Sequence, residues 1–345
     1  MKILKAYKDK ETMDRLPYSG DCPLVNALKE LYELDEIILE PDYKEEDYAN
    51  LIREYDVLLT MWSAPHVPNE LADNPGNLKY ICNITGGIGN CIDAPIVASP
   101  HIKITNWGDA AGYGIAEGAV SLLMTMLKDI PLVISRAEAN DDLPVKEHRG
   151  CSLYKKKVGI YGMGYIGREF AKYLRPFMPD MYAYDPYVEN MPEGVEKVNS
   201  LEELFSKSEI IAVHAGLCEE TMHTVTKELL ALLPDGGIVI NTARGAIIDE
   251  PALFDEVRSG RLRAGLDVLD TKAHPESHDL PPLDDPIRHS EIAVFTAHHI
   301  GGDEWSQDPS KLDFTALNCY RNLKHFADGE PLEFVIDYDR YIRMT

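Results

Sequence analysis

Paired cysteines and long apolar runs are both scarce in this sequence of 345 residues. The six cysteines are thinly spread and no two have Cys-x-x-Cys spacing, which argues against a disulfide scaffold or a structural zinc site. No apolar run approaches the roughly 18 residues of a membrane helix, and the first residues contain no signal-peptide core. We therefore expect a soluble, cytoplasmic protein.

Positive charge is also in short supply. Lys and Arg number 34 against 58 Asp and Glu, so the formal net charge is −24. Nucleic-acid affinity is built largely from clustered Lys and Arg, and anionic membranes attract basic segments. The acid excess therefore argues against nucleic acid and membrane as partners.

The length and the apolar share favour two domains with sizeable cores. At about 150 residues per domain, 345 residues suggest two, and 45% apolar residues are ordinary for a globular protein. From residue 158 onward, short continuous apolar runs begin 23 to 29 residues apart, the length of one strand and one helix. These runs predict strands buried on both faces of a parallel sheet. The predicted strands cover 158–161, 181–184, 210–213, 237–240, 264–268 and 292–295.

The first hundred residues repeat this rhythm more loosely. A helix is predicted over 24–34, and a long amphipathic pattern from Ala110 to about Lys128 predicts a helix that links the two domains. In the second half, Asp249 and Pro251 are suited to open a helix. The predicted strands of this first part begin at Ile3 and cover 36–39, 56–59, 80–82 and 102–105.

A glycine motif follows the first strand of the second half. Gly162-Met163-Gly164-Tyr165-Ile166-Gly167 has the Gly-x-Gly-x-x-Gly spacing and opens a predicted helix from Arg168 to about Leu174. Gly162 permits a tight turn, Gly164 lets a pyrophosphate approach the backbone, and Gly167 lets the helix pack closely on the strand. The pyrophosphate would then lie at the helix N-terminus. In this strand-to-helix context the motif predicts a dinucleotide site.

Asp185 ends the next predicted strand, 18 residues after Gly167. A carboxylate there accepts hydrogen bonds from the adenosine ribose hydroxyls and repels a 2′-phosphate, so NAD is favoured over NADP. A solvated Asp before a proline turn remains the alternative.

Three further motifs carry a resemblance to the D-isomer-specific 2-hydroxyacid dehydrogenase family, which includes phosphoglycerate, glycerate and D-lactate dehydrogenases. They are Asn241-Thr242-Ala243-Arg244-Gly245, Ala264-Gly265-Leu266-Asp267-Val268 and His298-His299-Ile300-Gly301-Gly302. With the glycine motif they follow the family's order and spacing over most of the chain. The loop Thr85-Gly86-Gly87-Ile88-Gly89 and the pair Ala116-Glu117 are also similar to the family.

The resemblance implies an α/β fold of two doubly wound parallel-sheet domains, with a Rossmann cofactor domain inserted into a flavodoxin-like substrate domain. The substrate domain would comprise residues 1–105 and 300–345, and the NAD-binding domain 106–299. The active site would lie in the cleft between them. The family also implies a homodimer and a small 2-hydroxyacid or 2-oxoacid as the substrate.

The resemblance assigns Arg244 to the substrate carboxylate and His299 to proton transfer. A planar, permanently charged guanidinium binds a carboxylate with two parallel hydrogen bonds, and an imidazole titrates near working pH. His298 stands where the family usually has proline and is the alternative to His299. Backbone N–H groups of Gly86, Gly87 and Ile88 would hold the other side of the carboxylate. The expected cofactor-binding residues are Gly162, Gly164, Tyr165, Ile166, Gly167, Asp185, Ala243 and Asp267.

Two of these assignments have structural alternatives. Asp267 would contact the nicotinamide carboxamide, or it closes its strand as a structural residue. The Gly86-Gly87 pair binds substrate, or it is a turn that needs glycine only for its backbone angles. For Trp62, which follows a predicted strand, core packing is favoured over a place in the substrate pocket.

The family pattern breaks at its catalytic glutamate, five positions after the Asp of Leu-Asp-Val. That position holds Lys272 here, and a two-residue insertion would place His274 there instead. Three interpretations stay open. Asp270 or Glu276 supplies the acid, or the histidine works without a carboxylate and with a shifted pH profile, or the chain binds NAD without useful turnover. Lys272 is also a candidate to recognise a second anionic group on the substrate.

The leading hypothesis is an NAD-dependent oxidoreductase that interconverts a D-2-hydroxyacid and its 2-oxoacid. The alternative is an NAD(H)-binding regulatory or interaction protein on the same scaffold, with an aldehyde or formate dehydrogenase as a weaker third. No metal is predicted, because the spacing of His274, Glu276 and His278 is typical of a polar loop rather than of a metal site.

Overall fold

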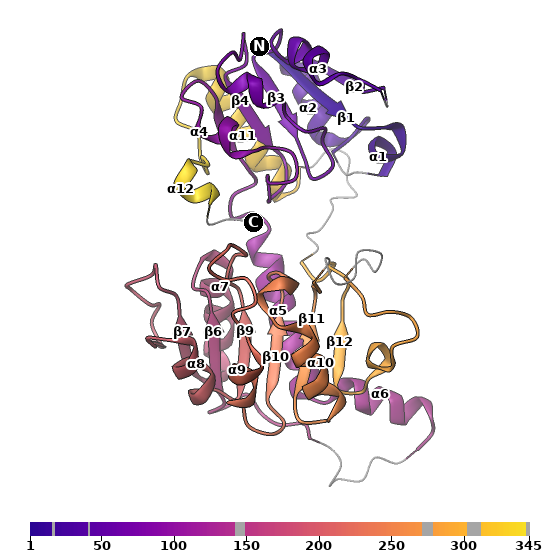
Figure 1. Cartoon of the computed structure of the whole chain (residues 1–345), viewed down its shortest axis with the longest axis vertical. Helices are drawn as coiled ribbons and strands as arrows, with labels where there is room; N and C mark the ends of the chain where they lie inside the picture. Colours follow the sequence, from indigo (N-terminus) through magenta and orange to yellow (C-terminus); the bar gives the residue numbers. More distant parts are fainter. Residues whose placement is uncertain (16–17, 41, 142–148, 271–278, 302–311, 343–345) are drawn as a thin grey trace. The chain divides into compact units, whose positions relative to one another are not determined.

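The chain divides into two compact units. The computed structural model describes residues 1–345 except 16–17, 41, 142–148, 271–278, 302–311 and 343–345. The first unit comprises Met1–Ala111 and Asp303–Thr345, and the second comprises Gly112–Gly302. Each unit is built on its own sheet (Figure 1).

The first unit contains a five-stranded parallel sheet in the order β2-β1-β3-β4-β5. This is the flavodoxin-like strand order, and it confirms the predicted fold class of this unit. The strands are β1 (Lys2–Tyr7), β2 (Glu33–Ile38), β3 (Val57–Thr60), β4 (Tyr80–Asn83) and β5 (Lys103–Thr105). The helices are α1 (Lys10–Arg15), α2 (Pro23–Leu31), α3 (Glu45–Ile52), η1 (Asn69–Ala72), α4 (Ala94–Ala98), α11 (Phe314–Asp328) and α12 (Tyr338–Tyr341).

The second unit contains a seven-stranded parallel sheet in the order β12-β11-β10-β9-β6-β7-β8. The strand order reverses between β6 and β9, and ligands of such sheets bind at the carboxyl ends of the strands at this reversal. The strands are β6 (Lys157–Tyr161), β7 (Asp180–Tyr184), β8 (Val195–Lys197), β9 (Ile210–Val213), β10 (Ile238–Asn241), β11 (Arg263–Leu266) and β12 (Ala293–Phe295). The helices are α5 (Gly112–Leu127), α6 (Ile130–Glu138), α7 (Tyr165–Leu174), η2 (Arg175–Phe177), α8 (Leu201–Lys207), α9 (Lys227–Ala231), η3 (Gly245–Ile247), α10 (Glu250–Arg258) and η4 (Pro286–His289).

The predicted strands of the second unit agree with β6, β7, β9, β10, β11 and β12 to within two residues at each end. Asp249 caps α10 as expected, since its side chain accepts a hydrogen bond from the Ala252 N–H. One helix start was wrong: α7 begins at Tyr165, not Arg168. Gly167 therefore lies in the first turn of the helix and not before it.

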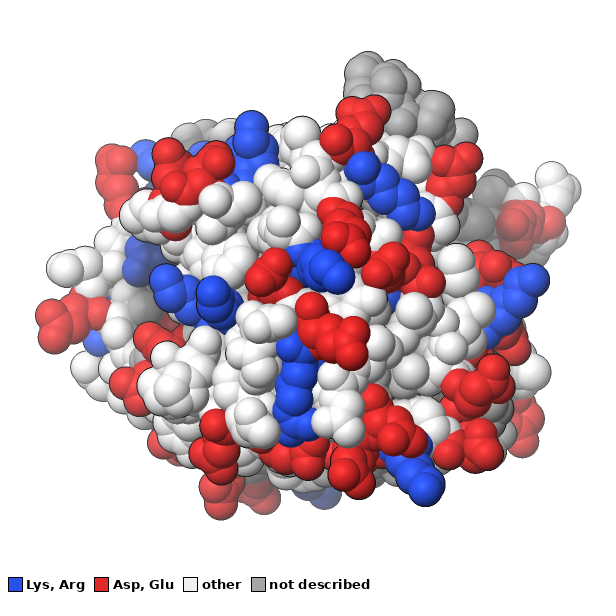
Figure 2. All heavy atoms as spheres, turned by 90° about the horizontal axis from the view of Figure 1, so that it is seen from above, with Lys and Arg blue, Asp and Glu red and all other residues white. Residues whose placement is uncertain are grey.

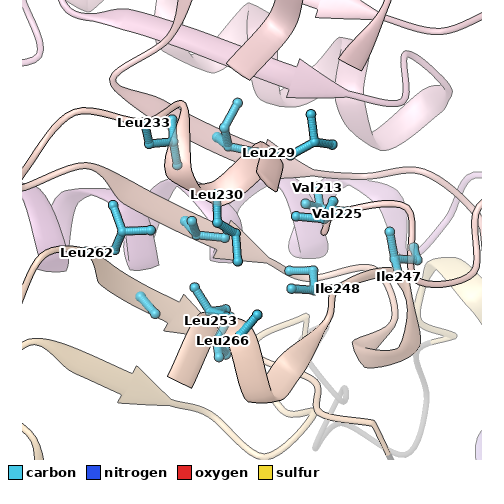
Figure 3. Packing of buried hydrophobic residues seen from close by; sticks show 14 of the residues in the cluster. Val213, Val225, Leu229, Leu230, Leu233, Ile247, Ile248, Leu253, Leu262 and Leu266 are labelled. Atoms are coloured by element: carbon cyan, nitrogen blue, oxygen red, sulfur yellow. The ribbon is translucent and has the colours of Figure 1, made fainter. Parts of the chain in front are cut away.

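Apolar side chains bury both faces of the second sheet. One cluster packs under α8, α9 and α10, and the other packs around α5 and α7. Figure 3 shows the first cluster, where Leu266 of β11 lies beside Leu253 of α10. Since the strands are covered on both sides, they need continuous apolar runs, as the sequence has.

The apolar character of the helices and the distribution of surface charge both bear on the expectations from the sequence. Among the described residues, no single helix is long and apolar enough to cross a membrane, although the bent pair α5 and α6 passes by length and composition together. Most of the apolar side chains of α5 are buried in the core of the second unit. On the face shown in Figure 2, acidic and basic side chains are intermixed.

Candidate active site

The glycine turn between β6 and α7 gives each glycine a different surrounding. Gly162 has φ +93°, and a Cβ there would press on the backbone of His214 and Ala215. A Cβ at Gly167 would overlap the carbonyl oxygen of Gly162. At Gly164, by contrast, a Cβ would meet no atom within 4 Å. The two outer glycines are thus required by the fold, whereas Gly164 leaves open space over the backbone.

Asp185 lies beside this turn, directly after β7. Its carboxylate accepts hydrogen bonds from the N–H of Met163 at 2.8 Å and from the N–H of Tyr187 at 2.9 Å. The structure therefore brings Asp185 and the glycine motif together, as the sequence predicts, and the turn itself orients the carboxylate. Tyr165 packs its ring edge-on against Tyr113 of α5, 5.5 Å between centroids.

These residues fit a dinucleotide. The open space at Gly164 is where a bound pyrophosphate would approach the backbone. No side chain caps the N-terminus of α7, so its first N–H groups and the positive end of the helix dipole suit an anion.

Arg244 follows β10 in a turn that the Asn241 side chain holds. The Asn241 amide donates to the Arg244 carbonyl at 3.0 Å and accepts from the Ala243 N–H at 3.0 Å. A Cβ at Gly245 would overlap the backbone of Leu269, so only glycine lets this turn lie against the chain that follows β11. The Arg244 guanidinium is half-buried and donates to the Ala243 carbonyl at 2.7 Å. Burial lowers the pKa of Arg244, and the negative charge of Asp279 opposes this effect.

Asp267 anchors the histidine turn at the end of β12. Its carboxylate oxygen Oδ1 accepts from the Thr296 hydroxyl at 2.6 Å and from the Ile300 N–H at 3.0 Å, and its carbonyl accepts from the His298 N–H at 2.6 Å. Asp267 is 4% exposed. These contacts tie Asp267 to the histidine turn through Oδ1 and the carbonyl oxygen.

The two histidines of the turn have different partners. His298 Nδ1 lies 3.2 Å from the carboxylate of Asp279, whereas His299 Nδ1 is hydrogen-bonded to the Ala297 carbonyl. Arg244, Asp267 and both histidines lie at the carboxyl ends of β10, β11 and β12, which are neighbours in the sheet.

The residues at the break in the family pattern are only partly described. Lys272, His274, Glu276 and His278 lie outside the described residues. Asp270 is described, and its carboxylate lies 3.4 Å from Nε2 of His223. The described residues contain no group of three or more His, Cys, Asp or Glu side chains that could hold a metal.

In the first unit, the loop after β4 has backbone N–H groups for which the described residues supply no acceptor. The Asn83 amide donates to the Thr85 carbonyl at 2.7 Å, and the Asn106 amide donates to the Gly86 carbonyl at 2.8 Å. Within the described part of the chain, no residue accepts a hydrogen bond from the N–H groups of Gly86, Gly87 or Ile88. The described side-chain contacts to the backbone of this loop are therefore made to its carbonyls.

Two tryptophans flank this loop. A Cβ at Gly86 would lie 2.7 Å from the indole of Trp107, and Trp62 packs edge-on against Trp107 with 5.4 Å between centroids. Trp62 is 39% exposed. The expectation of core packing for Trp62 was wrong, because its side chain is exposed and packs on the half-buried Trp107.

Sequence reasoning missed Asp279 and His214. Asp279 sits in a polar loop with no periodic pattern. His214 follows β9, and burial lowers its pKa to about 3. Its ring packs against Phe170, 4.8 Å between centroids. The signal in the sequence that could have identified His214 is its position directly after a predicted strand of the sheet.

Comparison with known proteins agrees with this arrangement. Residues 120–300, just over half of the chain, match the model of the D-isomer specific 2-hydroxyacid dehydrogenase family, NAD binding domain. The chain therefore carries an NAD-binding domain.

Named relatives extend the match beyond this domain. A hydroxypyruvate reductase from Thermotoga maritima is 34% identical over 281 residues, 80% of this chain and 87% of that protein. A D-3-phosphoglycerate dehydrogenase from Methanocaldococcus jannaschii is 29% identical over 90% of this chain, and the match spans 57% of that longer protein. The structure of a D-lactate dehydrogenase from Aquifex aeolicus, complexed with NAD and lactic acid, has a TM-score of 0.71 at 22% identity and covers 95% of this chain and 96% of its own. The chain belongs to the D-isomer specific 2-hydroxyacid dehydrogenase family.

Proposed function

We propose that this protein is an NAD-dependent oxidoreductase that interconverts a small D-2-hydroxyacid and its 2-oxoacid. The observation that carries the proposal is the meeting of Arg244, Asp267 and the histidine turn at the carboxyl ends of neighbouring strands, in the same unit as the glycine turn. The names of the relatives, a hydroxypyruvate reductase and a D-3-phosphoglycerate dehydrogenase, support the reaction class.

Each proposed role follows from a contact of the residue that performs it. The Arg244 guanidinium makes one hydrogen bond to a described residue, with the Ala243 carbonyl, and so has N–H donors left for the substrate carboxylate. In the first unit, the N–H groups of Gly86, Gly87 and Ile88 have no described acceptor, and we propose them as further donors for a substrate carboxylate. An imidazole of the histidine turn exchanges the hydroxyl proton, and the resemblance assigns this role to His299.

The cofactor roles belong to the second unit. Bound NADH supplies the hydride for the carbonyl carbon of the 2-oxoacid. Gly162, Gly164, Tyr165, Ile166 and Gly167 hold the pyrophosphate with backbone groups. Asp185 selects NAD over NADP through its carboxylate.

Ala243 and Asp267 complete the cofactor-binding set. We propose that the second unit is the cofactor domain and the first unit the substrate domain. A homodimer remains a prediction from the resemblance, and a cytoplasmic location remains a prediction from the cysteine content.

A panel of 2-oxoacids tests the proposal. The purified protein is mixed with NADH and pyruvate, hydroxypyruvate, glyoxylate, 2-oxoglutarate or 2-oxoisocaproate, and NADH absorbance is followed. We expect turnover with at least one of them, and the D-isomer of the product alone should reduce NAD in the reverse direction.

The matched control repeats the panel with NADPH, which Asp185 should disfavour. Firm NADH binding by fluorescence without turnover of any oxoacid would contradict the proposal and favour a regulatory NAD-binding protein.

A further inference from the structure

Asp279 places a carboxylate in contact with His298, and its charge also acts on Arg244. Its Oδ2 lies 3.2 Å from His298 Nδ1, and its Oδ1 accepts from the Leu269 N–H at 3.0 Å. The Asp279 side chain is 13% exposed, and its charge acts on Arg244. The carboxylate is therefore held by the end of β11 while it contacts the turn that follows β12.

The environment of Asp279 keeps it ionised. Burial alone would raise the pKa of this carboxyl, but hydrogen bonds from His298 and the Leu269 N–H, with the charges of His298 and Arg244, outweigh burial and lower the pKa. An ionised, half-buried carboxylate favours the charged form of an imidazole bonded to it. Asp279 can therefore accept a hydrogen bond from Nδ1 of His298 and orient its imidazole.

The backbone of the turn holds His298 in an unusual conformation. Ala297 and His298 have φ of +51° and +60°, a region that costs most non-glycine residues free energy. The hydrogen bonds to Asp267 keep the turn in this shape. In this strained backbone conformation, the His298 imidazole lies next to the carboxylate of Asp279.

We propose that Asp279 is the positioning residue of the reaction described above, and that His298, the imidazole it orients, is the histidine that exchanges the proton. The inference rests on the proposed function. In oxoacid reduction the carbonyl carbon gains a hydride from the bound cofactor and the carbonyl oxygen gains the proton from His298, which becomes neutral. In hydroxyacid oxidation the hydroxyl proton goes to neutral His298, and the hydride returns to the cofactor.

This assignment differs from the resemblance in both residues. It uses a carboxylate twelve positions after Asp267 instead of five, and it selects His298 over His299. His299 bonds a backbone carbonyl, and no described carboxylate contacts it. His298 contacts Asp279 through its ring and the Asp267 carbonyl through its backbone N–H, and the charge of Arg244 acts on the same Asp279.

The pH dependence of oxoacid reduction tests the proposal. Reduction needs a protonated imidazole, so the rate falls as pH rises through its pKa. Because Asp279→Asn removes the compensating charge, the alkaline limb of kcat/KM should move down by about one pH unit or more. The Kd for NADH should stay within about twofold, and Asp279→Glu should restore part of the shift. The matched control is Asp284→Asn, which removes the same charge from an exposed position in the same loop.

Substitution of the two histidines separates them. His298→Gln should lower kcat by roughly 10²- to 10⁴-fold, the usual range for general acid–base catalysis, and His299→Gln by less than tenfold. The reverse order would overturn the assignment to His298. An unchanged pH profile in Asp279→Asn, or a shift seen in Asp270→Asn instead, would overturn the role of Asp279.

Imidazole NMR gives a readout that does not need turnover. In ¹H–¹⁵N spectra of the ligand-free protein, the signal that disappears in His298→Gln should titrate at lower pH in Asp279→Asn than in the parent. If its midpoint is unchanged, the pairing is refuted whatever the activity. If the midpoint moves but the parent reduces no oxoacid, the proposed function fails and the pairing stands.

Discussion

Arg244 shows how one side chain is prepared for an anion. The Asn241 amide fixes its turn, and Gly245 lets the turn approach the backbone after β11. Half-buried, the guanidinium has lost water but has only one described hydrogen-bond acceptor, the Ala243 carbonyl. A substrate carboxylate would supply the missing acceptors, and the planar guanidinium would fix its orientation.

Arg244→Lys tests this role. Lysine keeps the charge but loses the pair of parallel donors, so we expect kcat/KM for the oxoacid to fall roughly 10- to 100-fold, as hydrogen bonds to charged groups are worth about 1.5–3 kcal/mol. The Kd for NADH, measured by fluorescence titration, should be unchanged. Equal losses in NADH binding and in oxoacid turnover would instead place Arg244 in the cofactor site.

His214 predicts a pH effect on stability. Its folded pKa of about 3 lies below the ordinary value of 6.5. The unfolded state therefore binds more protons between these values, and stability is lost as pH falls. From pH 7.5 to 5.5 this residue should lower the free energy of unfolding by about 1 kcal/mol.

Urea unfolding at the two pH values measures this effect. His214→Gln should reduce the loss by about 1 kcal/mol, whereas replacement of an exposed histidine, His101→Gln, should leave it unchanged. A His214→Gln protein with the parent's full pH dependence would show that another group is responsible.

At the scale of elements, the turn between β6 and α7 separates what folding requires from what binding requires. Gly167 touches the Gly162 carbonyl, whereas Gly164 faces open space. The sequence motif does not distinguish the three glycines. The structure shows that Gly167 packs against backbone, whereas a side chain at Gly164 would meet no atom within 4 Å.

Two alanine substitutions exploit this difference. Gly164→Ala should leave the melting temperature within a few degrees of the parent but weaken NADH binding at least tenfold, because the new methyl group occupies the approach of the pyrophosphate. Gly167→Ala should lower both stability and binding, since its methyl group overlaps backbone. Calorimetry and NADH titration of both variants decide, and normal NADH affinity in a well-folded Gly164→Ala protein would refute this account of the cofactor site.

Elements were predictable where their signal is local. Continuous apolar runs identified β6, β7 and β9 to β12, because a strand buried on both faces must be apolar throughout. The short edge strand β8 was missed, since Val195–Lys197 forms through its pairing with β7 and two of its three residues are exposed. Arg244 and the glycine motif were recognisable from their neighbours in the sequence. The Asp279–His298 contact joins loops 19 residues apart, and no pattern along the chain marks it.

At the scale of the whole molecule, the net charge bears on ligand binding and the order of the chain bears on folding. The net charge of −24 belongs to a protein whose proposed ligands are anions. Binding of such anions therefore needs local positive charge or free N–H donors, and in the second unit Arg244 and the glycine turn before α7 are the candidates. The order of the chain also has a consequence for folding. The first unit includes α11, which follows the whole second unit in the sequence. Ala316, Cys319 and Leu323 of α11 pack into the same cluster as Ile3, Tyr7 and Leu24.

Two substitutions on α11 measure how much the packing of this helix contributes to the stability of the first unit. Leu323 is fully buried and Leu317 is 36% exposed on the same helix. Leu323→Ala should destabilise the first unit by about 2–5 kcal/mol, whereas Leu317→Ala should cost less than about 1 kcal/mol. Urea unfolding followed by tryptophan fluorescence reports the first unit through Trp62 and Trp107. Equal effects of the two substitutions would contradict the packing described for α11.

The late position of α11 also sets an order of events on the ribosome. Strands β1 to β5 emerge first, yet Cys82 of β4 and its neighbours stay uncovered until Phe314–Asp328 has been translated. By then every strand of the second sheet is already available to pair. The part of the protein that is made first is therefore the last to finish folding. During that interval we expect the N-terminal segment to expose apolar surface, which makes a folding intermediate prone to aggregate.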